Sequence, residues 1–303
     1  MAARRILVTG AGGFVGRQLL APLQARGFAV HAVTTRARAP LPGITWHVAD
    51  LLTAEGRGAA LAVAPDTLLH AAWYVAHGKF WTAPENLAWA AASAGLLADF
   101  VRAGGRRFIG LGSCAEYGAA PAGAAPWAET RALAPATLYG LAKASFATRL
   151  ADAGISTAWA RLFHLFGPGE APGRLVPSVM AALRDGRPAD CASGRPVRDF
   201  ASTWFTGRAL AALAAGEVQG AVNVAAGNGL PIAALVGRIG RLSGRPALVR
   251  LGALPDRPDE VPSMVADTGR LRREVGFTEA CDLDGDLGRL WREAALAAPV
   301  GAA

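Results

Sequence analysis

The stretch Ile6-Leu7-Val8-Thr9-Gly10-Ala11-Gly12-Gly13-Phe14-Val15-Gly16 decides the fold. Three apolar residues run directly into glycines spaced Gly-x-x-Gly-x-x-Gly, and leucines at helical spacing follow. In such a strand–turn–helix unit, the first glycine permits a tight turn, the second lets the backbone approach a pyrophosphate, and the third lets the helix pack close to the sheet. The free N–H groups at the helix start attract phosphates. The stretch therefore predicts a dinucleotide site, whose cofactor-binding residues are Gly10, Gly13, Phe14, Val15 and Gly16.

Apolar runs of strand length alternate with helical segments along the first half of the chain. Strands are expected at 6–8, 28–34, 45–49, 67–70, 107–111 and 157–162, and helices near 55–63, 84–103 and 137–153. Helical connections between parallel strands are right-handed, and repeated units of this kind build a doubly wound parallel sheet. The predicted fold class is therefore α/β, of the Rossmann type.

The sequence pattern changes near Phe166, where a loop rich in glycine and proline begins. We expect residues 1–165 to form a dinucleotide-binding Rossmann domain. Residues 166–303 are expected to form mainly a smaller α/β substrate-binding domain. An apolar run at 221–225 is expected to return to the first sheet as a further strand.

The composition argues against several classes of protein. Of the 303 residues, 52% are hydrophobic and 18% charged, which is typical of a folded protein and not of a disordered one. The net charge of +8 comes from dispersed basic residues, so we expect no nucleic-acid partner. Cys114, Cys191 and Cys281 are too widely spaced for a disulfide framework or a zinc site, and no metal is expected. No apolar stretch is long enough to span a membrane or to serve as a signal peptide, so we expect a cytoplasmic protein without a membrane partner.

The end of the second expected strand indicates which dinucleotide binds. Sites for NAD place an acidic residue about 20 residues after the glycines, where it holds the ribose 2′-hydroxyl. Here the strand ends Val33-Thr34-Thr35-Arg36-Ala37-Arg38, and the first acidic residue of the chain is Asp50. A guanidinium pairs with the 2′-phosphate of NADP(H), whereas a carboxylate repels it. The sequence favours NADP(H), with Arg36 as the first candidate for the clamp and Arg38 as the second; the alternative that both are merely solvated stays open.

A tyrosine and a lysine stand one helical turn apart in Tyr139-Gly140-Leu141-Ala142-Lys143, on the same face of an expected helix. The chain has only three tyrosines and two lysines, so this pairing is improbable by chance. A lysine cation favours the phenolate, and we expect it to lower the pKa of Tyr139 toward the pH at which proton transfer is efficient. Ser113 follows an expected strand, where its hydroxyl is placed to polarise a substrate carbonyl.

These features resemble the extended short-chain dehydrogenase/reductase family, of the NAD-dependent epimerase/dehydratase type, in the branch that handles nucleotide-activated sugars. The resemblance covers most of the chain and implies that Ser113, Tyr139 and Lys143 are the catalytic residues. It matches Asn86 to a helix asparagine of the family. The further cofactor contacts that it implies are Asp50, Leu51, His70, Ala71, Ala72, Tyr139 and Lys143.

In the second half, the resemblance rests on Arg161-Leu-Phe-His-Leu-Phe-Gly-Pro168, Val176-Pro177, Arg198-Asp199-Phe200, Asn223-Val224 and Arg257-Pro-Asp-Glu260. It implies a nucleotide-diphosphate sugar as substrate and a homodimer, with 87–103 and 137–153 as candidate faces. The implied substrate-binding residues are Ser113, Cys114, His164, Val176, Arg198 and Arg257, where His164 replaces the asparagine of many members. The sequence leaves open whether Trp73, His77, Lys79 and Trp81 line the same pocket.

Departures from the family pattern narrow the expected reaction. Dehydratases of the family carry an acidic pair directly after the catalytic Ser or Thr, but here Cys114-Ala115 follow and Glu116 stands one place too late. Its epimerase–reductases use a cysteine and a histidine at places that Ala115 and Arg174 occupy here. Its simple 4-epimerases typically hold NAD through the acidic residue that this second strand lacks.

Reduction of a keto group needs only a hydride donor, a proton donor and a grip on the diphosphate. We therefore expect NADPH-dependent reduction of a keto group, at C4, on a nucleotide-linked deoxy sugar, a step of deoxysugar biosynthesis, with Tyr139 as the proton donor. The alternatives are a nucleotide-sugar 4-epimerase with tightly bound NAD(P), and a non-catalytic NADP-sensing protein on the same fold.

Overall fold

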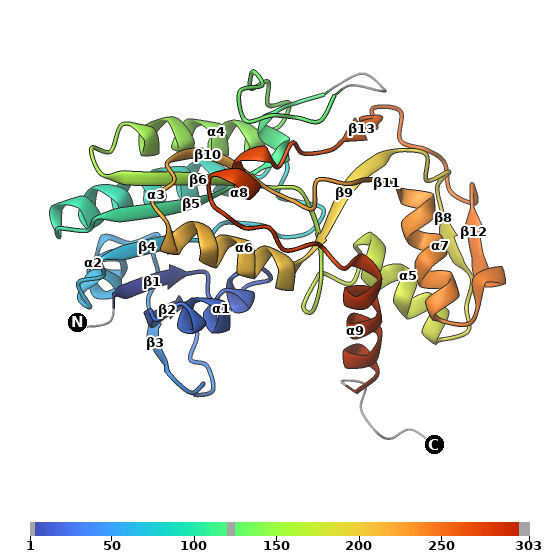
Figure 1. The fold of residues 1–303 in the computed structure, drawn as a ribbon, viewed down its shortest axis with the longest axis horizontal. Helices are drawn as coiled ribbons and strands as arrows, with labels where there is room; N and C mark the ends of the chain where they lie inside the picture. The colour runs from blue at the N-terminus through green and yellow to red at the C-terminus, as the bar shows by residue number, and fades with distance from the viewer. Residues whose placement is uncertain (1–3, 120–124, 297–303) are drawn as a thin grey trace.

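A seven-stranded parallel sheet forms the centre of the structure, a computed structural model that describes residues 4–119 and 125–296 (Figure 1). Across the sheet, the strands are β10 (Gly220–Val224), β6 (Ser156–Leu162), β5 (Arg107–Ser113), β4 (Thr67–His70), β1 (Arg5–Thr9), β2 (Ala29–Thr34) and β3 (Ile44–Val48). The predicted doubly wound α/β fold is confirmed. The strand order reverses between β1 and β4, and a crevice for ligands opens at such a point.

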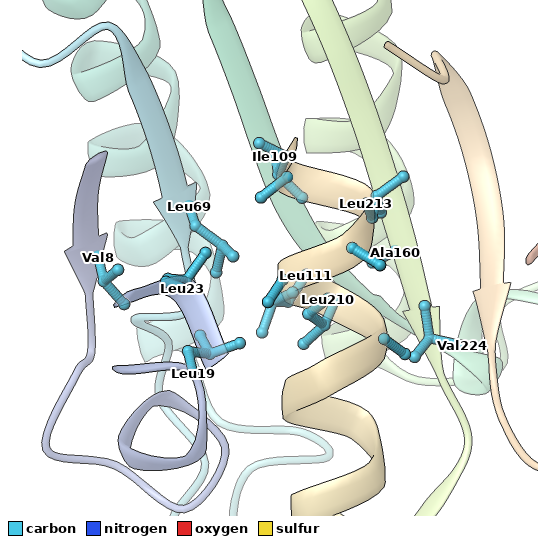
Figure 2. Close-up of a cluster of buried hydrophobic side chains, with 14 of the residues drawn as sticks. Val8, Leu19, Leu23, Leu69, Ile109, Leu111, Ala160, Leu210, Leu213 and Val224 are labelled. Atoms are coloured by element: carbon cyan, nitrogen blue, oxygen red, sulfur yellow. The ribbon is translucent and has the colours of Figure 1, made fainter. Parts of the chain in front are cut away.

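Helices cover both faces of this sheet (Figure 1). One face carries α1 (Leu20–Ala25) and α6 (Thr203–Ala215), and the other carries α2 (Ala54–Leu61), α3 (Glu85–Arg102) and α4 (Leu138–Ala151). Figure 2 shows the apolar core of the first face, where Leu210 and Leu213 of α6 meet Ile109, Ala160 and Val224 of the strands. The core of the second face contains Leu96, Phe100, Phe108, Phe146 and Trp159.

The expected strands and helices agree with the observed ones to within about two residues at each end. The difference that affects the site is at β5, which continues beyond Leu111 to Ser113 and so carries that hydroxyl on the last residue of the strand. The glycine turn leads first into a short 3-10 helix, η1 (Gly16–Gln18), before α1 begins.

Most of the remaining elements build a smaller assembly beside the carboxyl ends of the strands, but α8 (Gly269–Arg273) packs on the large sheet next to β10 (Figure 1). The strands β7 (His164–Phe166), β9 (Val197–Ser202), β11 (Gly229–Pro231) and β13 (Ser263–Met264) form one sheet, and β8 (Ala189–Cys191) pairs with β12 (Val249–Leu251). The helices of the smaller assembly are α5 (Leu175–Arg184), α7 (Ile232–Leu242) and α9 (Leu283–Leu296), with the 3-10 turn η3 (Pro246–Leu248). A further 3-10 turn, η2 (Cys114–Glu116), directly follows β5.

The two halves of the sequence interlock. Both α6 and β10 follow residue 166 in the chain, yet α6 covers one face of the large sheet and β10 pairs with β6 at its edge. The boundary between 165 and 166 stays a prediction. In the described ranges, no helix combines the length and the apolar character needed to cross a bilayer. The same ranges hold no cluster of three or more His, Cys, Asp or Glu side chains suited to a metal ion.

Candidate active site

A cavity of 1810 Å³ opens at the carboxyl ends of β1, β2, β4 and β5 and extends to the smaller assembly. Its walls include the glycine turn, the end of β2, the segment 71–81 after β4, the end of β5, and α4. On the opposite side it is bounded by residues of the β7–α5 segment and by 190–198 and 254–263. The cavity therefore joins the predicted cofactor turn to the predicted substrate region.

The glycine turn is built as the sequence predicts. Gly10 has a φ of +63°, and a Cβ there would lie 2.7 Å from the backbone nitrogen of Ala72. A Cβ on Gly16 would lie 2.1 Å from the carbonyl oxygen of Gly10, so the helix can approach the strand only without a side chain. The Arg17 side chain braces the turn by donating from Nε to the carbonyl of Gly13 at 3.0 Å. Phe14 and Val15 line the cavity beside it.

The two arginines after β2 lie differently. Arg38 lines the cavity, and its guanidinium covers the turn so closely that a Cβ on Gly12 would lie 2.5 Å from Nη2. Arg36 is exposed and is absent from the cavity wall, and its carbonyl accepts a hydrogen bond from Thr34 Oγ1 at 2.6 Å. The chain turns after Thr34 so that Arg38, the second candidate for the clamp, reaches the glycine turn, whereas Arg36, the first candidate, does not.

Of the predicted pair Asp50-Leu51, one residue reaches the cavity. Leu51 is buried on its wall. Asp50 is exposed, and its Oδ1 accepts a hydrogen bond from the backbone nitrogen of Leu52 at 3.0 Å. Asp50 thus orders the start of the turn before α2.

His70, an expected cofactor contact, is buried behind the cavity wall. Its ring is 3% exposed, with Nδ1 hydrogen-bonded to Thr9 Oγ1 at 2.7 Å and Nε2 to Ser93 Oγ at 2.8 Å. Burial lowers the pKa of His70 to about 3, so the ring is neutral. The histidine ties β1, β4 and α3 together, while Ala71 and Ala72 form the cavity wall.

Ser113, Tyr139 and Lys143 all line the cavity. Ser113 ends β5, and Tyr139 and Lys143 stand on one face of α4. Ser113 Oγ accepts a hydrogen bond from the backbone nitrogen of Ala115 at 3.2 Å, and its hydroxyl lies near enough to Tyr139 to act on the pKa of the phenol. The backbone nitrogen of Tyr139 also donates to the carbonyl of Trp81 at 3.1 Å, which fixes the start of α4 against the segment after β4.

The sequence predicts that Lys143 lowers the pKa of Tyr139, and this direction is wrong: the protein's own groups raise that pKa. Burial raises the pKa of this phenol above its usual value and outweighs the nearby Ser113 hydroxyl, which acts to lower that pKa. The ammonium of Lys143 points instead to the carbonyl of Leu111, to which Nζ donates at 2.8 Å, and lies 5.9 Å from the centre of the Tyr139 ring. The phenol consequently keeps its proton at neutral pH.

Glu116 has a structural role. Its fully buried carboxylate accepts hydrogen bonds from the backbone nitrogen of Ser113 at 2.7 Å, from Trp159 Nε1 at 2.9 Å and from Arg161 Nε at 2.9 Å. These contacts support the sequence interpretation that this carboxylate stands outside the family's acidic pair. At the neighbouring position, burial raises the pKa of the Cys114 thiol to about 12, so that residue lines the cavity as a neutral group.

The predicted substrate-binding residues of the second half all line the cavity: His164, Val176, Arg198 and Arg257. Arg198 is buried, paired with Glu260, and donates from Nη1 to the carbonyl of Val197 at 2.8 Å. Arg257 is exposed at the cavity. Burial and the charge of Arg198 lower the pKa of His164 to about 3, so its ring is neutral.

Sequence reasoning missed Glu170. Its side chain is 4% exposed, its Oε1 accepts from Arg174 Nε at 2.9 Å, and its Oε2 is buried with no hydrogen-bond partner among the described residues. Burial raises the pKa of Glu170 to about 7 in spite of the adjacent arginine. The glycine- and proline-rich loop gave no signal that this carboxyl would be buried, because the burial comes from the folding of that loop against the cavity.

The residues that the sequence left open are now placed. Trp73, His77 and Trp81 line the cavity, and Lys79 lies outside it. The rings of Phe80 and Trp81 pack edge-on against Tyr139, with centroids 4.9 Å and 5.9 Å away. The proton-bearing side chain thus sits against an aromatic wall.

Residues 6–225 match the model of the NAD dependent epimerase/dehydratase family. The chain is similar in structure to MoeE5 in complex with UDP-glucose and NAD, at 28% identity and a TM-score of 0.81 over 96% of this chain and 99% of that one. The fold is shared with DesIV, a dTDP-glucose 4,6-dehydratase from Streptomyces venezuelae, at 23% identity, a TM-score of 0.83, and 96% and 97% coverage. It is also shared with UDP-N-acetylglucosamine 4-epimerase from Methanobrevibacter ruminantium M1, at 21% identity, a TM-score of 0.84, and 98% and 100% coverage.

Proposed function

The chain belongs to the NAD dependent epimerase/dehydratase family, and from this premise we propose that it reduces a keto group, at C4, on a nucleotide-linked deoxy sugar with NADPH. The observation that carries the proposal is that the hydroxyl-bearing residues Ser113 and Tyr139 both line the cavity that contains the glycine turn. A carbonyl oxygen placed between these two hydroxyls would receive a hydrogen bond from one and a proton from the other.

The choice of NADPH rests on Arg38. Arg38 follows the end of β2, where the adenosine ribose of a dinucleotide lies in this type of fold, and its guanidinium reaches over the glycine turn, a position that fits a 2′-phosphate. The proposal differs in this respect from MoeE5, whose structure contains NAD. When bound, NADPH would supply the hydride.

The residues of the chain supply the remaining parts of the reaction. Tyr139 would hold a proton at neutral pH, since burial raises its pKa, and would donate it to the substrate oxygen. Ser113 would orient that oxygen through its hydroxyl. Lys143 would hold the nicotinamide ribose and stabilise the phenolate that proton donation leaves. Arg257, exposed at the cavity, and Arg198 are proposed to contact the diphosphate of the sugar nucleotide.

A panel of dTDP-, GDP-, CDP- and UDP-linked 4-keto sugars tests the reaction. Incubation with NADPH should decrease the absorbance of the reduced nicotinamide with at least one member of the panel, and the sugar product should carry a hydroxyl at C4. Consumption of NADPH without any change in the sugar, or no consumption with any member, contradicts the proposal.

The second candidate is a nucleotide-sugar 4-epimerase that keeps its cofactor bound. The similarity to MoeE5 with UDP-glucose and NAD favours this candidate. It predicts that NAD(P) co-purifies with the protein and that a sugar nucleotide changes configuration at C4 without net consumption of NADPH. A non-catalytic NADP sensor, by contrast, would not require the Tyr139–Lys143 pair.

We also propose that the protein is a homodimer that pairs through α3 and α4. Each helix leaves a leucine exposed on its outer side: Leu87 is 58% and Leu141 is 53% exposed. Two copies of these helices would cover each other in a four-helix arrangement. Light scattering should give twice the 31.1 kDa mass of the chain, and Leu141→Glu should give a monomer.

A further inference from the structure

Trp73 lies against the ammonium of Lys143 on the wall of the cavity. The distance from Nζ of Lys143 to the centroid of the Trp73 ring is 3.7 Å, well inside the roughly 6 Å over which an aromatic face attracts a cation. Both side chains are buried and both line the cavity. The same nitrogen donates to the carbonyl of Leu111. The rings of Trp159 and Tyr139 lie farther from Nζ, at 5.8 Å and 5.9 Å, so the ammonium rests between one backbone oxygen and the face of Trp73 as its nearest ring.

The fold, and not the lysine, fixes the indole of Trp73. Its Nε1 donates to Asn86 Oδ1 at 2.9 Å, and Asn86 Nδ2 donates to the carbonyls of Phe80 at 2.7 Å and Ala83 at 2.8 Å. Asn86 is fully buried in the first turn of α3. These three hydrogen bonds fix the plane of the indole, and none of them involves the lysine.

Burial opposes a charge on Lys143. Desolvation lowers the pKa of this ammonium to about 7, and Glu116, the carboxylate that favours the charged form, is already paired with Arg161. The other titratable groups that face the ammonium are Tyr139 on the same helix and His70 on β4, and the His70 ring is neutral. Besides the already paired carboxylate of Glu116, the neighbours that favour the charged lysine are the carbonyl of Leu111 and the ring of Trp73, which carry no net charge.

We propose that Trp73 is the positioning residue that keeps Lys143 charged and fixed one helical turn from Tyr139. The negative face of the indole attracts the ammonium. A carboxylate in the same place would pair with the lysine and cancel its field at the phenol, whereas the aromatic ring leaves that field intact. The catalytic meaning of this contact rests on the proposed function, but the contact itself does not.

The lysine content of the chain allows a direct test. Only Lys79 and Lys143 are present, and Lys79 is exposed and away from the cavity, so Lys79→Arg leaves Lys143 as the single signal in an NMR titration with labelled lysine. Site-specific incorporation of mono-, di- and trifluorotryptophan at position 73 weakens the ring face at nearly constant volume. We expect the pKa of Lys143 to fall in steps, by about one pH unit over the series, with the melting temperature unchanged.

The control series places the same fluorinated residues at Trp89, which also lines the cavity. That series should leave the titration of Lys143 where it is. A pKa of Lys143 that stays constant while position 73 is fluorinated overturns the proposal, and so does an equal response to fluorination at position 89.

Two variants with natural amino acids at position 73 extend the test to kcat. Trp73→Phe keeps an aromatic face and should keep most of kcat, whereas Trp73→Leu should lower kcat about tenfold and move the pH profile of kcat. Equal kcat values and pH profiles for the two variants contradict the proposal. Because the NMR titration needs no substrate, a response to fluorination in a protein without reductase activity would reject the proposed function and retain the role of Trp73.

Discussion

Arg161 and Glu116 form a buried ion pair directly behind Ser113, with 2.9 Å between Nε and Oε2 and side chains that are 6% and 0% exposed. Through the same carboxylate, the pair also holds the backbone nitrogen of Ser113. The carboxylate of Glu116 therefore anchors the end of β5 and, with it, the Ser113 hydroxyl, the proposed catalytic group.

Removal of this carboxylate should destabilise the protein strongly. Glu116→Gln leaves the Arg161 guanidinium charged and unpaired in a buried place, so the free energy of unfolding should fall by about 3 kcal/mol or more. The matched control is Asp185→Asn, which breaks the exposed pair with Arg187 and should cost less than about 1 kcal/mol. Urea denaturation measures the free energy of unfolding of both variants. Equal losses of this free energy would show that the buried pair contributes no more to stability than the exposed one.

The position of Arg38 predicts a specific effect on cofactor affinity. Arg38→Ala should weaken NADPH binding about 10- to 100-fold and leave NADH binding nearly unchanged, because only NADPH has a 2′-phosphate for the guanidinium to contact. Arg36→Ala, a change in an exposed arginine away from the cavity, should have a much smaller effect. Fluorescence titration with both cofactors distinguishes the two arginines, and a larger loss for Arg36→Ala would contradict this assignment.

The phenol of Tyr139 should be essential for turnover and dispensable for cofactor binding. Tyr139→Phe removes the proton donor and should lower kcat about 10²- to 10⁴-fold, with a nearly unchanged Kd for NADPH. The control is Tyr74→Phe, since Tyr74 is partly buried beside the cavity wall without lining it. Steady-state kinetics with a keto-sugar nucleotide is the measurement, and normal turnover in Tyr139→Phe refutes the proton-donor role.

Glu170 should make stability depend on pH. Its pKa is about 7 in the folded protein and 4.5 for an ordinary glutamate, so the folded state holds the proton more tightly than the unfolded state. The stabilisation that protonated Glu170 gives is fully present below about pH 4.5. It is lost as the pH rises to 7 and above, which lowers the free energy of unfolding by up to about 3 kcal/mol. Unfolding free energies at pH 5 and pH 8 should therefore differ more in the wild type than in Glu170→Gln. The same difference in both proteins would show that Glu170 titrates normally.

The sequence sufficed for the features that local pattern controls. The apolar runs and the glycine spacing predicted the strands, the turn at Gly10 and Gly16, and the sharing of one helix face by Tyr139 and Lys143. These follow from the periods of strands and helices and from the steric requirement for a missing Cβ. The family resemblance added the pairing of Ser113 with Tyr139, which lie on separate elements.

Other features depend on contacts between distant parts of the chain. The partners of His70 are 61 and 23 residues away, so the sequence could not show that both ring nitrogens are occupied. The sign of the pKa change at Tyr139 depends on how deeply the ring is buried. Whether Arg36 or Arg38 reaches the turn depends on the path of an irregular loop, for which no residue periodicity exists.

The interlocking of α6 and β10 with the large sheet limits how this protein can be recombined. A fragment that stops at residue 165 would lose its edge strand and uncover a row of leucines and alanines along one side of the sheet. Hybrid enzymes that join this cofactor half to the substrate half of a relative should therefore import α6 and β10 from the same parent as the first 165 residues. Suitable crossover points lie in the loops on either side of these two elements, and a single splice at the midpoint would yield an insoluble product.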